Sequence, residues 1–139
     1  MRDLIEIALT QYGTKEIQGP VANNPEIIKY AGSIGQIWVK TDETAWCSAF
    51  ISCSCMWATL PYSKELDARS WLKIGKNTDS PELGDIVVFW RSSPESWKGH
   101  VGIFIRQTKS WVYMLGGNQG NKVCIKAYNK SRVLGYRTL

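Results

Sequence analysis

The carboxy-terminal part of the sequence lacks acidic residues. After Glu95 the chain carries eight Lys and Arg side chains and no Asp or Glu, and the whole chain of 139 residues has a formal net charge of +5. Residues 1–70 contain six basic and eight acidic residues, whereas residues 71–139 contain eleven and four. This uneven charge indicates a polyanionic partner, which from charge alone is nucleic acid, an anionic membrane surface or an acidic cell-wall polymer.

Long apolar runs are also missing. No stretch reaches the ~18 apolar residues that span a bilayer. The start, MRDLIEIALTQYG, carries three charges where a signal peptide has an apolar core of ~7–15 residues. We therefore expect synthesis in the cytoplasm without a cleaved leader. Hydrophobic residues at 44% and charged residues at 21% predict one packed domain over residues 1–139 and disfavour disorder.

Cysteine and histidine are scarce. Four cysteines are too few for a disulfide scaffold at this length, so we expect free thiols made in a reducing compartment. Cys53 and Cys55 would point to different sides of a helix, and no histidine lies at ligand spacing, which disfavours zinc. We predict no metal and no cofactor. We expect Cys53, Cys55 and Cys124 to behave as small core residues.

The first half of the chain has the periodicity of helices. Apolar spacing and stop signals predict helices over residues 3–11, 24–32, 44–59 and 64–72. Asn24 before a first-turn proline is a cap for the second helix, and Ser63 for the fourth. The third segment, TAWCSAFISCSCMWAT, is apolar almost all round and predicts a buried central helix, capped by Thr41 or Asp42.

The second half has the shorter period of strands. Strands are predicted over residues 85–90, 101–105, 111–115 and 123–125, with a last short strand around 133–136. Helices followed by consecutive strands predict an α+β fold in which an antiparallel sheet packs on the amino-terminal helices.

Cys47 falls in the first turn of the predicted central helix. The unpaired N–H groups and the positive dipole end of a helix lower the pKa of a thiol and favour its nucleophilic thiolate. A small buried hydrophobic residue is the alternative interpretation of Cys47. His100 is the only histidine. It follows a loop that would place it at the edge of the sheet. It is therefore the one candidate general base for a reaction in which a thiol is the nucleophile.

A third group should orient the imidazole by accepting a hydrogen bond from it. The candidates follow the next strand, in Gly116-Gly117-Asn118-Gln119. If the preceding hairpin loop has an odd length, Asn118 lies opposite His100; if it is even, Gln119 becomes the diagonal neighbour. Residues 107–110 lack the Asn-Gly of a two-residue turn, so we favour Asn118, with Gln119 second. A plain turn remains the alternative for this segment.

These residues resemble the CHAP superfamily of cysteine, histidine-dependent amidohydrolases and peptidases. Three blocks carry the resemblance: Ala45-Trp46-Cys47-Ser48-Ala49-Phe50, Gly84-Asp85-Ile86-Val87-Val88-Phe89 and Gly99-His100-Val101-Gly102-Ile103. A small phage-type subgroup also has Glu16-x-x-Gly19, Asn24-Pro25-x-Ile27-x-x-Tyr30, Asp42-Glu43-Thr44 and Leu115-Gly116-Gly117-Asn118-Gln119-Gly120-Asn121. The likeness covers nearly the whole chain.

The resemblance implies a papain-like (NlpC-like) fold, with Cys47 as nucleophile, His100 as general base and acid, and Asn118 as the residue that orients it. Many CHAP enzymes have an acidic residue at the third position, followed by asparagine, whereas this chain has Gly-Asn-Gln. The implied activity is hydrolysis of an amide bond in the peptidoglycan stem peptide, by thiol chemistry that needs no metal. The backbone N–H of Cys47 helps to stabilise the oxyanion. Gln36, Asn23 and Tyr12 are candidates for a second donor.

Relatives of this kind are typically phage endolysins, made in the host cytoplasm and released to the periplasmic wall; an antibacterial effector has a similar sequence. We expect a monomer that acts on bacterial peptidoglycan, attracted to anionic wall or outer-surface polymers by Lys98, Lys122, Lys126, Lys130 and Arg132. Charge reversal at Lys126 and Lys130 is then expected to slow lysis without touching the chemistry.

A nucleic-acid-binding module is the alternative of a different class. Its basis is the basic half of the chain together with seven tryptophans, which stack on bases or on sugar rings when they are not core residues. Such a module has no need of a Cys–His pair, and no nucleic-acid-binding motif is present. No nucleic acid is therefore expected as a partner. An inactive relative that only binds is disfavoured by the intact Cys47 and His100.

Overall fold

The computed structural model describes residues 3–17, 23–39 and 46–139. The helices are α1 (Leu4–Leu9), α2 (Pro25–Ser33) and α3 (Cys47–Trp57), and two 3-10 helices are η1 (Ala68–Lys73) and η2 (Lys130–Arg132). The strands are β1 (Lys76–Thr78), β2 (Ile86–Trp90), β3 (Gly99–Gln107), β4 (Trp111–Gly116), β5 (Cys124–Asn129) and β6 (Val133–Thr138). Among those ranges no helix combines the length and apolar character needed to cross a bilayer.

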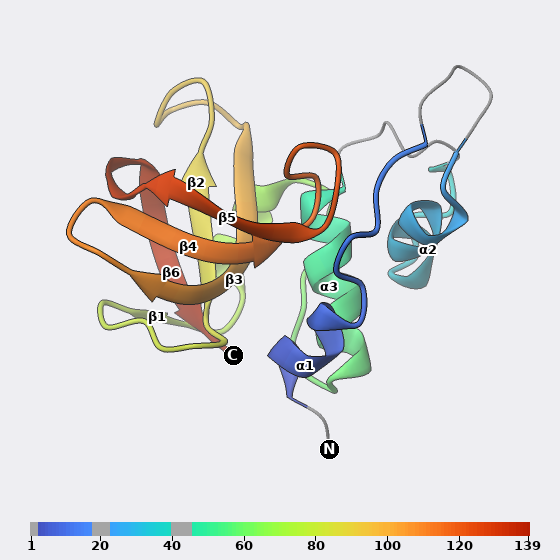
Figure 1. The fold of residues 1–139 in the computed structure, drawn as a ribbon, viewed down its shortest axis with the longest axis horizontal. Helices are drawn as coiled ribbons and strands as arrows, with labels where there is room; N and C mark the ends of the chain where they lie inside the picture. Colours follow the sequence, from blue (N-terminus) through green and yellow to red (C-terminus); the bar gives the residue numbers. More distant parts are fainter. Residues whose placement is uncertain (1–2, 18–22, 40–45) are drawn as a thin grey trace.

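The six strands form one antiparallel sheet, and the fold is α+β as predicted. The strand order is β1-β6-β2-β3-β4-β5. The sheet is strongly twisted, and in Figure 1 β2 and β6 run across the direction of β4 and β5. The five predicted strands are present, although β5 continues to Asn129, four residues beyond its predicted end. Strand β1 was not predicted because its three residues, KNT, have no apolar alternation.

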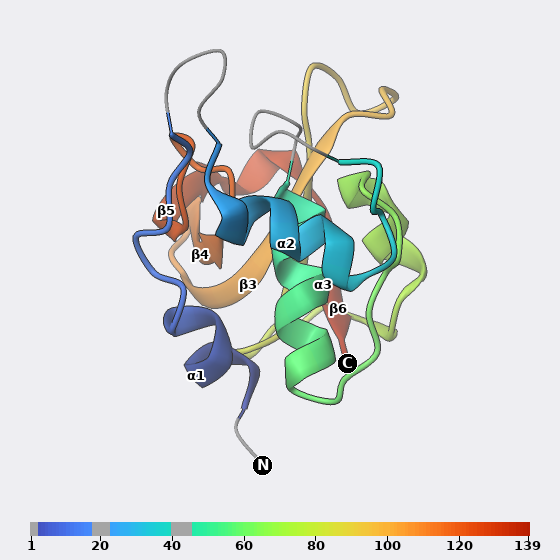
Figure 2. The same ribbon diagram turned by 90° about the vertical axis from the view of Figure 1, so that its right-hand side faces the viewer.

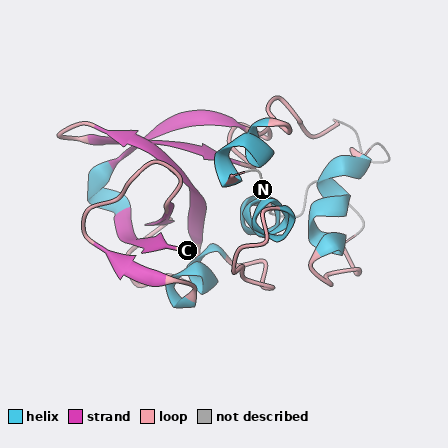
Figure 3. Cartoon of the chain, turned by 90° about the horizontal axis from the view of Figure 1, so that it is seen from below, coloured by secondary structure: helices cyan, strands magenta, loops and turns pink. Residues whose placement is uncertain are grey.

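Helix α3 lies between the sheet and the other helices. Figure 3 shows α3 between the sheet and α2, and Figure 2 shows α2 crossing its upper end. Every residue of α3 from Cys47 to Cys55 is buried, which explains why its sequence is apolar nearly all round. The first two helices begin as predicted, with the side chains of Asp3 and Asn24 accepting backbone N–H groups of the first turn.

The predicted start of α3 was wrong. The helix begins at Cys47, and its N-cap is Trp46, whose side chain makes no capping hydrogen bond. An indole N–H cannot accept a hydrogen bond, so the side chain of Trp46 does not cap the first-turn N–H groups of α3. Thr41 and Asp42, the predicted caps, lie outside the described residues.

The helix predicted over residues 64–72 is replaced by the later 3-10 helix η1. The side chain of Ser63 does accept the N–H of Glu65, as a cap would. However, the carbonyl groups that a helix would use next are already bonded: Ser52 Oγ donates to Ser63, Gln36 Nε2 to Lys64 and Ser48 Oγ to Glu65. Tertiary hydrogen bonds to buried serines of α3 therefore outweigh the local helical tendency.

The sheet has a hydrophobic core on each face. The core on the helix side joins α1, α2 and α3 to alternate residues of β2 and β3, including Val88, Val101 and Ile103. The core on the other face contains Val87, Phe89, Phe104, Val112 and Met114, with Tyr128 packed against it. Because side chains alternate across a strand, His100 lies on this second face, where it pairs with Phe89 of β2.

Candidate active site

Cys47 is the first residue of α3, as the sequence predicted to within the first turn. Its side chain is buried, with 5% of the residue exposed. The N–H groups at the start of a helix have no partner in the preceding turn, so they point toward the region around the sulfur. The backbone N–H groups of Ser48 and Cys47 both favour the thiolate.

The prediction that the helix start lowers the pKa of the Cys47 thiol is nevertheless wrong once all contributions to that pKa are combined. Burial raises the pKa of Cys47 above its ordinary value. The backbone N–H of Val101, that of Ser48 and the charge of Arg91 each oppose this rise without cancelling it. Desolvation of a charged sulfur is the larger effect in an interior position. Cys47 therefore rests as a neutral thiol.

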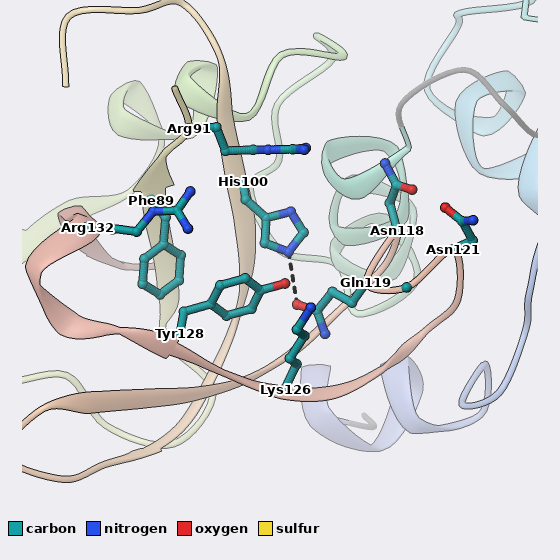
Figure 4. A pocket seen from close by; sticks show the side chains of 10 residues that line it. Phe89, Arg91, His100, Asn118, Gln119, Asn121, Lys126, Tyr128 and Arg132 are labelled. Atoms are coloured by element: carbon teal, nitrogen blue, oxygen red, sulfur yellow. Dashed lines mark hydrogen bonds between the residues drawn. The ribbon is translucent and has the colours of Figure 1, made fainter. Parts of the chain in front are cut away.

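His100 lies near the start of β3 and is 4% exposed. Its Nε2 is 2.9 Å from Oε1 of Gln119, and its ring centre lies 5.2 Å from that of Tyr128. Figure 4 shows the imidazole reaching toward Gln119, with the phenol of Tyr128 alongside. The imidazole is thus held by a hydrogen bond at one nitrogen and by an aromatic neighbour.

The orientation of the Gln119 amide determines the tautomer of His100. Gln119 Nε2 donates to the carbonyl oxygen of Cys124 at 2.7 Å, so its Oε1 is the end that faces the imidazole. An amide oxygen can only accept, so His100 Nε2 carries the proton and Nδ1 has a free lone pair. Nδ1 is therefore the nitrogen that can take a proton from a thiol.

Asn118, the first choice from the sequence, does not make this hydrogen bond; Gln119, the second choice, does. Near the site the pairing matches the preferred register, since Ile103 pairs with Leu115, and this pairing, if continued, would set Asn118 opposite His100. The odd hairpin loop on which that preference rested is absent: Gln107 pairs with Val112, and a register shift between Phe104 and Arg106 produces the pairing near the site. But β4 ends at Gly116, and Asn118 has a φ of +57°, which turns the chain out of the strand. The turn brings the next side chain, Gln119, back under the imidazole.

Two glycines allow this turn to lie so close to the site. A Cβ at Gly116 would lie 2.7 Å from Gln119 Oε1, and a Cβ at Gly117 would lie 2.7 Å from the ring of Trp46. Both distances are shorter than van der Waals contact allows. The Gly-Gly pair is thus required by the packing of Gln119 and of the residue before Cys47.

Burial lowers the pKa of His100 to about 4. The hydrogen bond that His100 donates to Gln119 acts in the opposite direction, and the charges of Arg91, Lys126 and Arg132 lower the pKa further. A cation near an imidazole disfavours a second positive charge there. At neutral pH His100 is therefore neutral, like Cys47.

Cys47 and His100 open into two neighbouring cavities. The His100 cavity, of about 390 Å³, is lined by His100 and Gln119, and the Cys47 cavity, of about 250 Å³, includes Leu66 and Trp97. Arg91 lines both cavities. No hydrogen bond joins the thiol to the imidazole among the described residues. However, the backbone N–H of Val101, the residue after His100, lowers the pKa of the Cys47 thiol. Catalytic hydrogen bonds are often long in a free enzyme and shorten when substrate binds.

Several residues of the site were missed or misplaced by sequence reasoning. Tyr128, Arg91 and Arg132 line the His100 cavity but were not proposed for it. Lys126, expected to act on the outer surface, also lines this cavity, so its charge reversal would alter the surroundings of His100. The available signal was the period of two in β5, which sets Lys126 and Tyr128 on one face.

The loop before β3 is held in place by Arg69. Its guanidinium donates to the carbonyl oxygens of Lys98, Pro94 and Ser93 at 2.8, 2.8 and 2.9 Å. Planar guanidinium groups give well-oriented multiple hydrogen bonds. The same loop carries Trp97, which is 73% exposed at the rim of the Cys47 cavity.

The remaining cysteines are core residues or lie close to the core. Cys53 and Cys55 are fully buried and Cys124 is partly buried, and all are free thiols. In the part of the chain that the structure describes, His, Cys, Asp and Glu side chains form no group of three that could hold a metal ion.

The three candidates for a second oxyanion donor do not line either cavity. The Gln36 amide is engaged on both sides, donating to Lys64 and accepting from Trp38 Nε1. Tyr12 is 54% exposed. Asn23 is not among the described lining residues of either cavity.

Comparison with protein-family models and with curated proteins gives no match for this chain.

Proposed function

We propose that this protein is a peptidoglycan hydrolase with a papain-like fold, which cleaves an amide bond of the cell-wall stem peptide through Cys47 and His100. The observation that carries the proposal is the pairing of the only histidine with a side-chain amide, next to a cysteine at the start of a helix. The hydrogen bond at Nε2 leaves Nδ1 as the base, and β3 connects His100 directly to Val101 beside the sulfur. The sequence blocks around Cys47 and His100 agree with this arrangement.

The first half-reaction transfers the acyl group to the enzyme. As substrate binds, the proton of the Cys47 thiol passes to His100 Nδ1 and the sulfur attacks the amide carbonyl carbon. The backbone N–H groups at the start of α3 face the negative charge that develops on the carbonyl oxygen. The carbon–nitrogen bond then breaks, and His100 gives its proton to the departing amine.

The second half-reaction releases the acid. A water molecule gives a proton to His100 and adds to the thioester carbonyl. The carbon–sulfur bond breaks, and the proton returns from His100 to the sulfur of Cys47. Gln119 keeps its hydrogen bond to Nε2 throughout, and so stabilises the imidazolium that forms after each proton transfer.

Because Cys47 and His100 are both neutral before substrate binds, the substrate itself takes part in activating the thiol. Burial opposes both the thiolate and the imidazolium, so proton transfer is unfavourable before substrate arrives. Once the carbonyl carbon is in place, transfer and attack occur together and the charge moves to the oxyanion. Within this proposal a phage endolysin is the first assignment and an antibacterial effector the second, because both use this chemistry.

The test is lysis of purified peptidoglycan by variants at two cysteines of the same helix. Cys47→Ala is expected to reduce turbidity clearing to background, while Cys53→Ala retains activity within about twofold, because only Cys47 opens into a cavity that adjoins His100. Circular dichroism checks that both variants fold. Mass spectrometry of the released muropeptides identifies the amide bond that is cut. Full activity of a folded Cys47→Ala variant would overturn the proposal.

A further inference from the structure

The charged side chains described around the His100 cavity are all positive. Of the ten described residues that line it, three are cationic and none is acidic; the cations, named here the cation cluster, are Arg91, Lys126 and Arg132. The other polar lining groups are neutral side chains such as Asn118 and Asn121. Its volume of about 390 Å³ is in the range of small-ligand sites. An uncompensated positive cavity is a place where an anion binds.

The cation cluster is positioned but not neutralised by the rest of the described chain. Arg132 donates from Nε and Nη2 to the carbonyl oxygen of Trp90, at 3.2 and 2.9 Å, and its guanidinium lies 5.2 Å from the centre of the Trp90 ring. The ammonium group of Lys126 lies 5.5 Å from the centre of the Tyr128 ring. Neither contact supplies negative charge, so both cations keep their attraction for an anion.

Neutral donors stand on the opposite rim. Figure 4 shows Asn118 and Asn121 on one side of the cavity, and Arg132 with Phe89 on the other. Both asparagines have left-handed backbone angles, with φ of +57° and +63°, which lift their amides out of the strand. Their turn is fixed by the hydrogen bond from Gln119 N to Lys122 O and by a bridge between Lys122 and Lys15. The rim is thus a built feature.

We propose that the His100 cavity is a carboxylate-binding subsite, which selects substrates that carry a free carboxylate beside the amide bond to be cut. This inference rests on the proposed hydrolase function. Guanidinium groups bind planar carboxylates in pairs of hydrogen bonds, and side-chain amides complete such sites. The three cations line one cavity beside His100 with a volume of about 390 Å³, which fits one small anionic group.

A carboxylate in this cavity would also act on His100. Among the described residues, the charged or titratable groups near the imidazole are the cation cluster, Tyr128 and Cys124 of β5 and Cys47 of α3, and all three cations lower the pKa of His100. A bound anion offsets their charge and makes the imidazole a stronger base. A substrate with the correct carboxylate therefore activates the base that cleaves it.

The binding test uses the single histidine as a reporter. Glutarate is added to the whole protein carrying labelled histidine, and the His100 titration is followed by NMR, with neutral glutaramide as the matched probe. We expect glutarate to raise the titration midpoint by roughly one pH unit, as a nearby opposite charge does, and glutaramide to leave it unchanged. The effect is expected to be lost in Arg91→Gln and Lys126→Gln but kept in Lys109→Gln, which removes an exposed charge outside the cavity.

The kinetic test compares stem-peptide fragments whose carboxylates are free with the same fragments converted to carboxamides. We expect kcat/KM to fall roughly 10- to 100-fold on amidation, the effect of one charge-assisted hydrogen bond, and the difference to shrink in Arg91→Gln. Equal cleavage of both fragments with no response to glutarate would overturn the subsite and leave the hydrolase proposal standing. Cleavage of neither fragment would overturn the hydrolase proposal, while NMR still decides the carboxylate site. Tighter binding of inorganic phosphate than of glutarate would overturn the choice of carboxylate.

Discussion

Nε2 of His100 and Oε1 of Gln119 are 2.9 Å apart, and the other end of the same amide donates to the carbonyl oxygen of Cys124 at 2.7 Å. Gln119 is 2% exposed, so water cannot replace either interaction easily. One buried amide thus connects the imidazole to the backbone of β5. This connection selects the tautomer of His100, which no strand or helix pattern encodes.

Gln119→Ala is expected to lower kcat by roughly 10- to 100-fold, because a buried hydrogen-bond donor left without its partner costs about 1–3 kcal/mol. Gln107→Ala is the matched control and is expected to change kcat by less than about threefold, because Gln107 is exposed and lines neither cavity. Nitrogen NMR of the single histidine should show a mixture of tautomers only in Gln119→Ala. Equal losses in both variants would contradict the assignment.

Gly116→Ala is expected to reduce activity through Gln119. The new Cβ would lie 2.7 Å from Gln119 Oε1 and displace it from the imidazole. Gly32→Ala is the control, because a Cβ at this helical position meets nothing within 4 Å and should stabilise the protein by roughly 0.5–1 kcal/mol. Thermal unfolding and lysis assays measure both effects. A Gly116→Ala protein with full activity and an unchanged His100 tautomer would show that the close packing at Gly116 does not matter.

The Cys47 thiol is expected to react slowly with iodoacetamide at neutral pH. Burial raises its pKa, so the thiolate fraction at pH 7 is smaller than that of free cysteine, and the rate should still be rising with pH above about 8.5. Peptide mass spectrometry separates Cys47 from the fully buried Cys53 and Cys55. A fast rate that stays constant from acid to neutral pH would instead indicate a preformed thiolate–imidazolium pair.

The stability of the fold should fall as pH decreases from 6.5 to 4. In this window the unfolded chain binds a proton at His100 with the ordinary pKa of 6.5, whereas the folded protein, with a pKa of about 4, does not. The unfolded state then binds more protons, so the free energy of unfolding decreases, by roughly 3 kcal/mol over the window. Urea unfolding at several pH values measures this.

His100→Gln is the control for that window. The variant lacks the titrating group, so the difference in unfolding free energy between it and the wild type should shrink toward low pH. Other groups that titrate in this range are present in both proteins and cancel in the difference. Parallel pH curves for the two proteins would contradict a lowered His100 pKa.

The sequence alone determined the class of the fold and supplied the candidate groups of the proposed site. The apolar segment around Cys47 predicted a buried helix, and the alternation from Ile86 onward predicted the sheet, because local periodicity reports which side of an element is buried. The presence of one histidine and one cysteine at a helix start limited the candidates for thiol chemistry to Cys47 and His100.

Only the tertiary structure decided how these groups are arranged. Asn118 was preferred for its register, but the backbone leaves the strand before reaching it, and Gln119 fills the position. The expected low pKa of Cys47 is reversed by burial under segments distant in sequence. Likewise, the basic residues after Glu95 gave a net charge, but folding brings Lys126 and Arg132 to the imidazole together with Arg91. Desolvation and the meeting of charges depend on distances through space, which a sequence pattern does not contain.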